Sequence, residues 1–187
     1  MNSFYDDKEL QGLGLQSYGE NVYISRKASI YGADRISIGD NVRIDDFCIL
    51  SGCIQIGNFI HIAAYSALYG GTSGIRIEDF ANISSRVSVY SISDDYSGAS
   101  MTNPMIPDEY KNVINKKIYI GKHVIIGSTS VVLPGVVLKE GSAFGSFSLI
   151  KCDSEEWSIN AGIPCKKLKE RKRGALEMEK KLKEMLI

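Results

Sequence analysis

Residues 38–68 read IGDNVRIDDFCILSGCIQIGNFIHIAAYSAL, a stretch in which every sixth residue is aliphatic. These positions are Ile38, Ile44, Leu50, Ile56, Ile62 and Leu68. A helix repeats every 3.6 residues and a half-exposed strand every two, so a period of six indicates one short strand and one corner per repeat. Three such repeats would close one triangular coil, with the aliphatic side chains pointing into it.

The same period governs most of the chain. It occupies Ile24, Ile30 and Ile36, resumes at Ile77, Ile83 and Val89, and returns at Ile120, Ile126, Val132, Leu138, Phe144 and Ile150. Four places after an aliphatic position stands a smaller residue that can fill the space beside it, as at Cys48, Ser66, Ala81, Ser130 and Ser142. Stacked coils would bury one long core, so the pattern predicts an all-β protein, a parallel β-helix over residues 20–165.

Two stretches interrupt the period, and a third replaces it. Residues 70–74 form a short interruption, and residues 93–117, which contain two prolines, have no six-residue register and are expected to form an extruded loop. Residues 1–19 are expected to cap the prism. Residues 166–187 are expected to form a C-terminal helix, with an apolar stripe that packs on the prism or on a partner subunit. That stripe would contain Leu168, Ala175, Met178, Leu182 and Met185.

Composition restricts the partners and the compartment. Lysine and arginine number 22, as do aspartate and glutamate, so global charge indicates neither a nucleic-acid nor a membrane-surface partner. The N-terminal residues lack the basic segment and apolar run of an export signal, and no stretch approaches the ~18 apolar residues of a membrane span. We therefore expect a cytoplasmic protein. Its four cysteines are scattered, which favours reduced thiols over a zinc site or a disulfide framework.

The hexapeptide repeats, the interruption at 93–117 and the closing segment Asn160–Lys166, NAGIPCK, resemble the left-handed β-helix acyltransferases, or hexapeptide transferases. Within that superfamily the chain is similar to sugar acetyltransferases, especially the N-acetyltransferases of nucleotide-linked amino-dideoxy sugars such as dTDP-4-amino-4,6-dideoxyglucose. The resemblance implies a left-handed helix, acetyl-coenzyme A as acyl donor, and a role in O-antigen or capsule biosynthesis. It also implies a homotrimer with its active sites at the subunit interfaces.

The resemblance also indicates residues that would hold the donor. Matching positions are Ser128 and Ser146, although both could simply be small corner residues. Lys166 and Lys167 follow the Gly-Ile-Pro turn, where cations would complement the phosphates of coenzyme A. Lys151 is a further candidate, but the neighbouring Cys152 stands where relatives commonly have lysine.

A histidine that this superfamily uses as a base is absent here. O-acetyltransferases carry it in the strand that leads into the extruded loop, and the matching position is Asp94. A sugar hydroxyl needs a base such as histidine, whereas a neutral amine attacks a thioester unaided and needs orientation and removal of its proton. The sequence therefore predicts N-acetylation with Asp94 as the catalytic carboxylate.

Neighbouring polar residues are candidates for sugar binding. Asp95 and Tyr96 follow Asp94 at the mouth of the loop, and Ser84 and Ser85 lie in the turn of the preceding coil. The alternative is that the Asp-Asp-Tyr-Ser-Gly segment is only a polar turn, because its residue types favour turns.

Other functions stay open at this point. If His61 or His123 reached the acceptor, an O-acetyltransferase would be restored, although surface or corner positions are expected for both. A zinc enzyme of the carbonic anhydrase type normally needs three histidines, and the chain has two, so no metal is expected. A non-catalytic β-helical scaffold would need neither the loop nor the basic segment.

Overall fold

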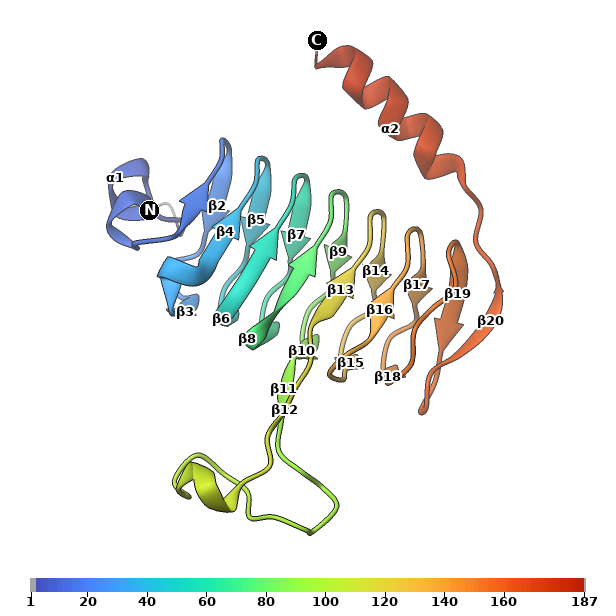
Figure 1. Cartoon of the computed structure of the whole chain (residues 1–187). Helices are drawn as coiled ribbons and strands as arrows, with labels where there is room; N and C mark the ends of the chain where they lie inside the picture. The colour runs from blue at the N-terminus through green and yellow to red at the C-terminus, as the bar shows by residue number, and fades with distance from the viewer. Residues whose placement is uncertain (1–2, 187) are drawn as a thin grey trace.

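Short parallel strands stack into a left-handed β-helix, as the six-residue period predicts (Figure 1). The computed structural model describes residues 3–186. Successive coils lie side by side from the N-terminal end of the prism to β19, and the C-terminal helix α2 stands beyond a long connection (Figure 1).

Three rows of strands form the faces of the prism. One face contains, in order, β2 (Val22–Ile24), β5 (Val42–Ile44), β7 (Ile60–Ile62), β9 (Asn82–Ile83), β14 (Ile125–Ile126), β17 (Ala143–Phe144) and β19 (Ser158–Ala161). A second contains β1 (Ser17–Tyr18), β4 (Ile36–Ile38), β13 (Ile118–Ile120) and β16 (Val137–Leu138). The third contains β3 (Ser29–Tyr31), β10 (Ser88–Tyr90), β15 (Val131–Val132) and β18 (Leu149–Ile150). The long strands β6 (Ile49–Ile56) and β8 (Ala67–Ile77) bend from the third face to the second.

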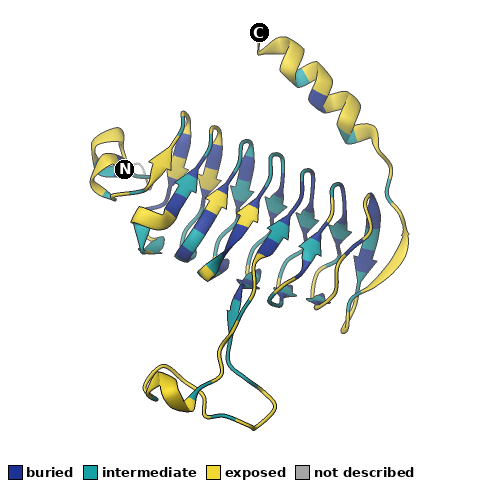
Figure 2. Ribbon diagram, in the orientation of Figure 1, coloured by how far each residue is buried: buried dark blue, intermediate teal, exposed yellow. Residues whose placement is uncertain are grey.

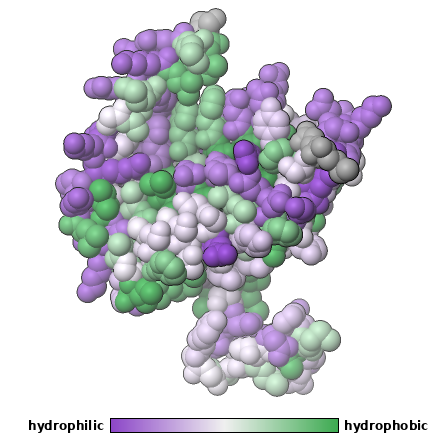
Figure 3. All heavy atoms as spheres, turned by 180° about the vertical axis from the view of Figure 1, so that it is seen from behind, coloured by the Kyte–Doolittle hydropathy of each residue, from purple (hydrophilic) through white to green (hydrophobic). Residues whose placement is uncertain are grey.

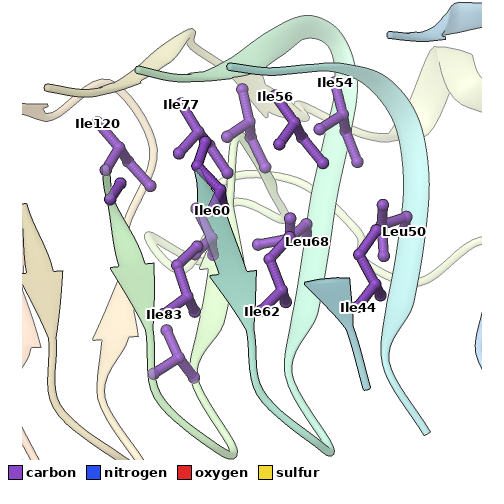
Figure 4. Close-up of a cluster of buried hydrophobic side chains, with 14 of the residues drawn as sticks. Ile44, Leu50, Ile54, Ile56, Ile60, Ile62, Leu68, Ile77, Ile83 and Ile120 are labelled. Atoms are coloured by element: carbon purple, nitrogen blue, oxygen red, sulfur yellow. The ribbon is translucent and has the colours of Figure 1, made fainter. Parts of the chain in front are cut away.

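The predicted core residues fill the prism. Seventeen of the eighteen aliphatic or aromatic positions of the six-residue register are buried, and the smaller residues four places on, from Cys48 to Ser142, are buried as well. The labelled side chains in Figure 4 point into the interior between the strands. Ile30 alone is half-buried, because β3 belongs to the first coil and pairs with a strand on one side only. Each fully buried aliphatic side chain contributes about 1.5–3 kcal/mol.

Corner geometry shows a feature that the period does not predict. At most corners the third residue after the inward aliphatic residue has a left-handed backbone, and along one corner three of these residues are aromatic, with φ of 56° at Phe59, 62° at Phe80 and 59° at His123. Their rings stack along the prism at centroid distances of 5.0 Å between Phe59 and Phe80 and 5.2 Å between Phe80 and His123. The stacking offsets the cost of a left-handed conformation at a bulky residue.

The interruption at 93–117 is an excursion from the prism, as expected. Strands β11 (Ile92–Ser93) and β12 (Ile114–Asn115) pair antiparallel as its stalk, and the distal part contains a short 3-10 helix, η2 (Asp108–Tyr110). In the view from behind, the excursion hangs below the body on a narrow neck (Figure 3). The shorter interruption at 70–74 is absorbed within β8, where Gly71 and Gly74 adopt positive φ.

A helix caps the N-terminal end of the prism. Helix α1 (Asp7–Gly12) begins with a capping box in which Asp6 and Glu9 exchange side-chain-to-backbone hydrogen bonds. Its Leu10 is buried against the first coil. Residues 3–19 therefore close the core, and residues 1–2 of the expected cap lie outside the described part of the chain.

The C-terminal segment differs from the helix expected over 166–187. Residues Lys166–Glu170 form strand β20, which pairs antiparallel with β19, and α2 spans Gly174–Met185. The helix-favouring composition of this segment is overridden at its start because β19 offers an unpaired strand edge. Leu168 is therefore a strand residue and is 64% exposed.

The apolar stripe expected on α2 is also only partly right. Figure 2 shows that α2 is mostly exposed, and one of its residues is buried. That position is Glu179, flanked on the same face by half-buried Ala175 and Leu182, whereas Met178 and Met185 are exposed. Ion pairing with the prism decides which face turns inward. Within residues 3–186 no helix has the length and apolarity needed to span a bilayer.

Candidate active site

A cavity of about 770 Å³ lies where the excursion leaves the prism. Its wall combines outward-facing residues of β6, β8 and β10 with residues of the excursion. The lining residues are Ser51, Tyr69, Tyr90, Ile92, Ser93, Asp94, Asn103, Pro104, Lys111 and Val113. Asp94 is the predicted catalytic residue among them.

The carboxylate of Asp94 is available to a ligand. Asp94 is half-buried, and its side chain makes no hydrogen bond or ion pair with any residue between 3 and 186. Its backbone carbonyl accepts a hydrogen bond from the hydroxyl of Ser93 at 3.1 Å, which helps to hold the loop entry. A carboxylate presented in this way can accept a hydrogen bond from a bound amine or hydroxyl.

The cationic side chain that lines the cavity, Lys111, already has an ion-pair partner. The ammonium of Lys111 lies 2.9 Å from the carboxylate of Asp108, and the Lys111 side chain is only 11% exposed. The Asp108 carboxyl has a lowered pKa because it accepts this hydrogen bond. Lys111 is therefore paired within the distal loop, and it makes no ion pair with Asp94.

Two stacked tyrosines form the prism side of the cavity, and sequence reasoning missed them. Tyr69 and Tyr90 pair in register on β8 and β10, and their rings lie 5.0 Å apart with an interplanar angle of 13°. Burial, together with the neighbouring Tyr90 and Tyr31, raises the pKa of Tyr69. A signal existed: each stands one position after an inward aliphatic residue and therefore points outward on the same face.

Asp95 and Tyr96 do not line this cavity. Asp95 accepts hydrogen bonds from the backbone and hydroxyl of Ser97, both at 2.8 Å, and from the hydroxyl of Ser100 at 3.1 Å. These bonds lower the pKa of Asp95 and give it a turn-stabilising place in the loop. Tyr96 is 93% exposed. Both observations support the turn interpretation of this segment.

Ser84 and Ser85 lie at a corner together with the predicted donor residues. The register of β9, β14 and β17 aligns Ser85, Ser128 and Ser146 on three successive coils. The row is continuous, since the Thr129 amide donates to the Ser85 carbonyl at 3.0 Å and the Phe147 amide to the Ser128 carbonyl at 2.9 Å. β10 runs between this corner and the stalk, so Ser84 and Ser85 do not share a cavity with Asp94 in a single chain.

The predicted lysines lie at the C-terminal end of the prism. Lys166 and Lys167 line a cavity of about 90 Å³ that also contacts Cys152, and Lys151 is exposed beside it. Lys167 is engaged with Glu155 at 2.6 Å and Glu170 at 2.5 Å, which raises its pKa.

Lys166 differs from Lys167 in its ion pairing. Its ammonium has no ion pair with any residue of the described chain. Of the two neighbouring lysines, Lys166 is therefore the one available to a phosphate.

Neither histidine lines the cavity that contains Asp94. His61 Nε2 lies 2.7 Å from Asp45 on an outer face. His123 is buried at the aromatic corner, and its Nε2 lies 2.8 Å from Glu179 Oε2. Both imidazoles thus have carboxylate partners elsewhere. In the part of the chain that the structure describes, no three His, Cys, Asp or Glu side chains cluster closely enough to hold a metal ion.

Comparison with known proteins places this geometry among acyltransferases. The dTDP-4-amino-4,6-dideoxy-D-glucose acyltransferase of Escherichia coli is 50% identical over 188 residues, covering 99% of this chain and 97% of the relative. AntD, an N-acyltransferase from Bacillus cereus, solved in complex with dTDP and 3-hydroxybutyryl-CoA, is 54% identical, covers each chain completely and superposes with a TM-score of 0.97. No family model matches the chain.

Two further structures of AntD carry substitutions. One is its D94A mutant in complex with dTDP and coenzyme A, and the other is its S84A mutant in complex with dTDP-4-amino-4,6-dideoxyglucose and coenzyme A. Each is 52% identical, covers 99% of this chain and 100% of its own, and has a TM-score of 0.97.

Proposed function

Because the chain belongs to the dTDP-4-amino-4,6-dideoxyglucose acyltransferase family, we propose that it transfers an acyl group from acyl-coenzyme A to the amine of that nucleotide sugar. We infer acetyl-coenzyme A as the donor. The uncommitted carboxylate of Asp94 in the cavity at the root of the excursion is the observation that carries the proposal.

In the proposed reaction Asp94 acts on the attacking amine. The neutral amine attacks the thioester carbon, a carbon–nitrogen bond forms, and the carbon–sulfur bond of the tetrahedral adduct then breaks. Asp94 accepts a hydrogen bond from the amine, orients its lone pair and takes the proton that nitrogen must lose. The coenzyme A thiolate leaves with the electron pair of the carbon–sulfur bond and is protonated at neutral pH, by water or by the proton that Asp94 has taken from nitrogen.

The corner that contains Ser85, Ser128 and Ser146, here called the serine corner, is the proposed binding site of the acyl donor. Backbone groups beside Ser128 and Ser146 form a straight row along which an extended pantetheine arm can bind. Lys166, at the end of that row, has a free ammonium that complements the phosphates of coenzyme A. Lys151 and Lys167 are weaker candidates, since Lys151 lies outside the small cavity and Lys167 is already paired with two glutamates.

A homotrimer would join the two halves of the site. In one chain the width of a prism face separates the serine corner from Asp94, so a neighbouring prism must place its corner against the excursion. In that arrangement Ser84 and Ser85 of one chain would face Asp94 of another. Mixing an inactive Asp94→Asn variant with an inactive Lys166→Ala variant should restore part of the activity if sites are shared between chains.

The positions substituted in AntD support the proposed roles of Asp94 and Ser84. In that protein's own numbering they are 94 and 84, which coincide with Asp94 and Ser84 in a chain of nearly the same extent. Asp95 and Tyr96 receive no such support, and their contacts favour a structural role in the loop.

The proposed product is an amide-bearing sugar nucleotide, a precursor suited to O-antigen or capsule assembly. Acyl-coenzyme A and nucleotide sugars are cytoplasmic metabolites, so the proposal places the reaction in the cytoplasm. The proposed reaction requires neither a nucleic acid nor a membrane.

A thiol-release assay tests the proposal. Acetyl-coenzyme A and 3-hydroxybutyryl-coenzyme A are each offered with dTDP- and UDP-linked 4-amino sugars, and with the matching 4-hydroxy sugars. Turnover confined to amino sugars supports N-acylation, and turnover only with hydroxy sugars would overturn it. A protein whose melting temperature does not rise with coenzyme A would instead be a scaffold.

A further inference from the structure

A bulge in β8 lies at the foot of the excursion. Strands β6 and β8 pair in parallel, with Gly52 opposite Gly71 and Ile54 opposite Ile75. On β6 one residue separates the members of these pairs, whereas on β8 three residues, 72–74, separate them, so β8 carries two extra residues. The short glycine-rich interruption of the six-residue period is therefore a β-bulge, a feature that often lies beside active sites.

The bulge holds the side chain of Asn115, a residue of the stalk. Asn115 lies on β12 and pairs with Ile92 of β11. Its Oδ1 accepts a hydrogen bond from the Ser73 amide at 3.1 Å, and its Nδ2 donates to the hydroxyl oxygen of Thr72. The Ser73 hydroxyl donates to the backbone carbonyl of Asn115 at 3.0 Å. Hydrogen bonds thus join two adjacent bulge residues to a stalk residue 42 and 43 positions later in the chain.

A glycine at position 71 permits this close approach. Gly71 has φ of +52°, and an added Cβ would lie 3.1 Å from Asn115 Oδ1 and 3.1 Å from Cβ of Ile92. A side chain at Gly71 would therefore press on both strands of the stalk. The bulge combines one position that must be small with two neighbouring positions that supply hydrogen-bonding groups.

The stalk needs this support. Strands β11 and β12 contain two residues each, and an isolated two-stranded hairpin is at best marginally stable in water. The excursion joins the prism through this narrow connection (Figure 1). Asp94 follows β11 directly, two residues after Ile92, the residue that pairs with Asn115. The direction of the stalk therefore decides where the Asp94 carboxylate lies.

We propose that Asn115, held by Thr72 and Ser73, is a positioning residue that fixes the stalk and thereby places the Asp94 carboxylate at the acceptor amine. The inference rests on the proposed function, because it takes Asp94 as the group that acts on the amine. A misplacement of about 1 Å at a reacting centre can cost on the order of 100-fold in rate. Loss of the contacts should lower kcat and leave the KM for acetyl-coenzyme A unchanged, since the serine corner lies elsewhere on the prism.

Matched substitutions of Thr72 test the contact without disturbing the core, because Thr72 is exposed. Thr72→Val keeps the shape of the side chain and removes the hydroxyl, so we expect kcat to fall by about 3- to 10-fold. Thr72→Ser keeps the hydroxyl and should retain kcat. Thr102→Val makes the same change at an exposed residue of the excursion whose side chain has no hydrogen bond within residues 3–186, and it should have the wild-type kcat.

A double-mutant cycle shows whether Asn115 acts through Asp94. Asn115→Ala should lower kcat by about 10- to 100-fold in the wild-type background. In an Asp94→Ala background there is no carboxylate to position, so the same substitution should change kcat by less than about twofold. A merely structural role would give the same factor in both backgrounds, and that result would overturn the proposal. Melting temperatures verify that the variants are folded.

The outcomes separate the positioning role from the reaction. If wild type acylates the amino sugar and both Thr72→Val and Asn115→Ala retain its kcat, the positioning role is wrong and the proposed function stands. If wild type acylates no amino sugar, the proposed function is wrong, and amide hydrogen exchange then tests the stalk. Faster exchange of residues 92–115 in Asn115→Ala would support the hold of the bulge on the stalk, and unchanged exchange would contradict it.

Discussion

Glu179 Oε2 lies 2.8 Å from Nε2 of His123, a buried contact that ties the C-terminal helix to a corner 56 residues earlier in the chain. Lys122 and Lys183 bind the other carboxylate oxygen at 2.6 and 2.7 Å. Above the imidazole, the Phe80 ring stacks at 5.2 Å, and the indole of Trp157 lies at 5.9 Å on a tilted plane. Helix α2 is therefore held by charge and hydrogen bonding at an aromatic corner, and not by an apolar stripe.

This contact predicts a pH-dependent stability. Burial alone would raise the pKa of Glu179, but hydrogen bonds from Lys122, Lys183 and His123 outweigh it and lower the pKa to about 2 from the ordinary 4.5. A lowered folded-state pKa stabilises the protein above the ordinary value, and that contribution is lost as pH falls from about 4.5 to 2. Its upper bound is about 3 kcal/mol.

Glu179→Gln should therefore lower the free energy of unfolding by about 1–3 kcal/mol at pH 7, and by about half as much or less at pH 3. Urea denaturation at the two pH values measures the difference. Glu177→Gln, an exposed change on the same helix, is the matched control and should be nearly neutral. Equal losses for Glu179→Gln at both pH values would contradict the assigned ionisation.

Substitution of Asp94 should affect turnover and not folding. Asp94→Asn keeps the size of the side chain but cannot take a proton, so we expect kcat to fall by about 10²–10⁴-fold with an unchanged melting temperature. Steady-state thiol release with acetyl-coenzyme A and the amino sugar provides the measurement. Asp34→Asn, in the exposed 3-10 helix η1 (Ala33–Arg35), controls for a general change in charge. Retention of wild-type kcat in Asp94→Asn would remove Asp94 from the mechanism.

Gly141→Ala should destabilise the aromatic corner. Gly141 has φ of +69°, and an added Cβ would lie 2.3 Å from the ring of Trp157. The ring would have to move away from His123, so we expect a loss of about 2–3 kcal/mol in thermal or urea unfolding. Gly174→Ala, at the start of α2 with nothing within 4 Å of the added atom, should be neutral or slightly stabilising. If Gly141→Ala and Gly174→Ala had the same free energy of unfolding, the corner around Trp157 would accommodate the added methyl group, and the prediction would be wrong.

The cysteines should differ sharply in reactivity. Burial raises the pKa of Cys48 to about 11, so at pH 8 the thiolate fraction is on the order of 0.1%. Cys152 is exposed. In the folded protein, Ellman's reagent should label Cys152 rapidly and leave Cys48 unmodified until denaturant is added. Mass spectrometry of the labelled peptides identifies the sites, and Cys152→Ser should lack the fast reaction; fast labelling of Cys48 would contradict its burial.

The sequence by itself determined the prism. Side-chain direction in a strand alternates locally, so a six-residue period was enough to identify the inward positions, the strand-and-corner repeat and the stretch that could not fit into it. Asp94 became a candidate through the resemblance to the hexapeptide transferases, as the position that matches the histidine of the O-acetyltransferases, and its place at the mouth of the excursion favoured a functional role over a turn. Ile30 shows the limit of this local reasoning, since its exposure depends on lying in the first coil and not on its place in the repeat.

Only the tertiary structure decided which outward residues meet. Ser51, Tyr69, Tyr90 and Asp94 share a cavity because coils stack in a fixed register, a relationship that no short window of sequence contains. Residues 166–170 became a strand because β19 had a free edge, and Glu179 became buried because His123 and two lysines could bind its carboxylate. Local periodicity therefore fixes the inside of a β-helix, whereas its outer surface and its site depend on long-range pairing.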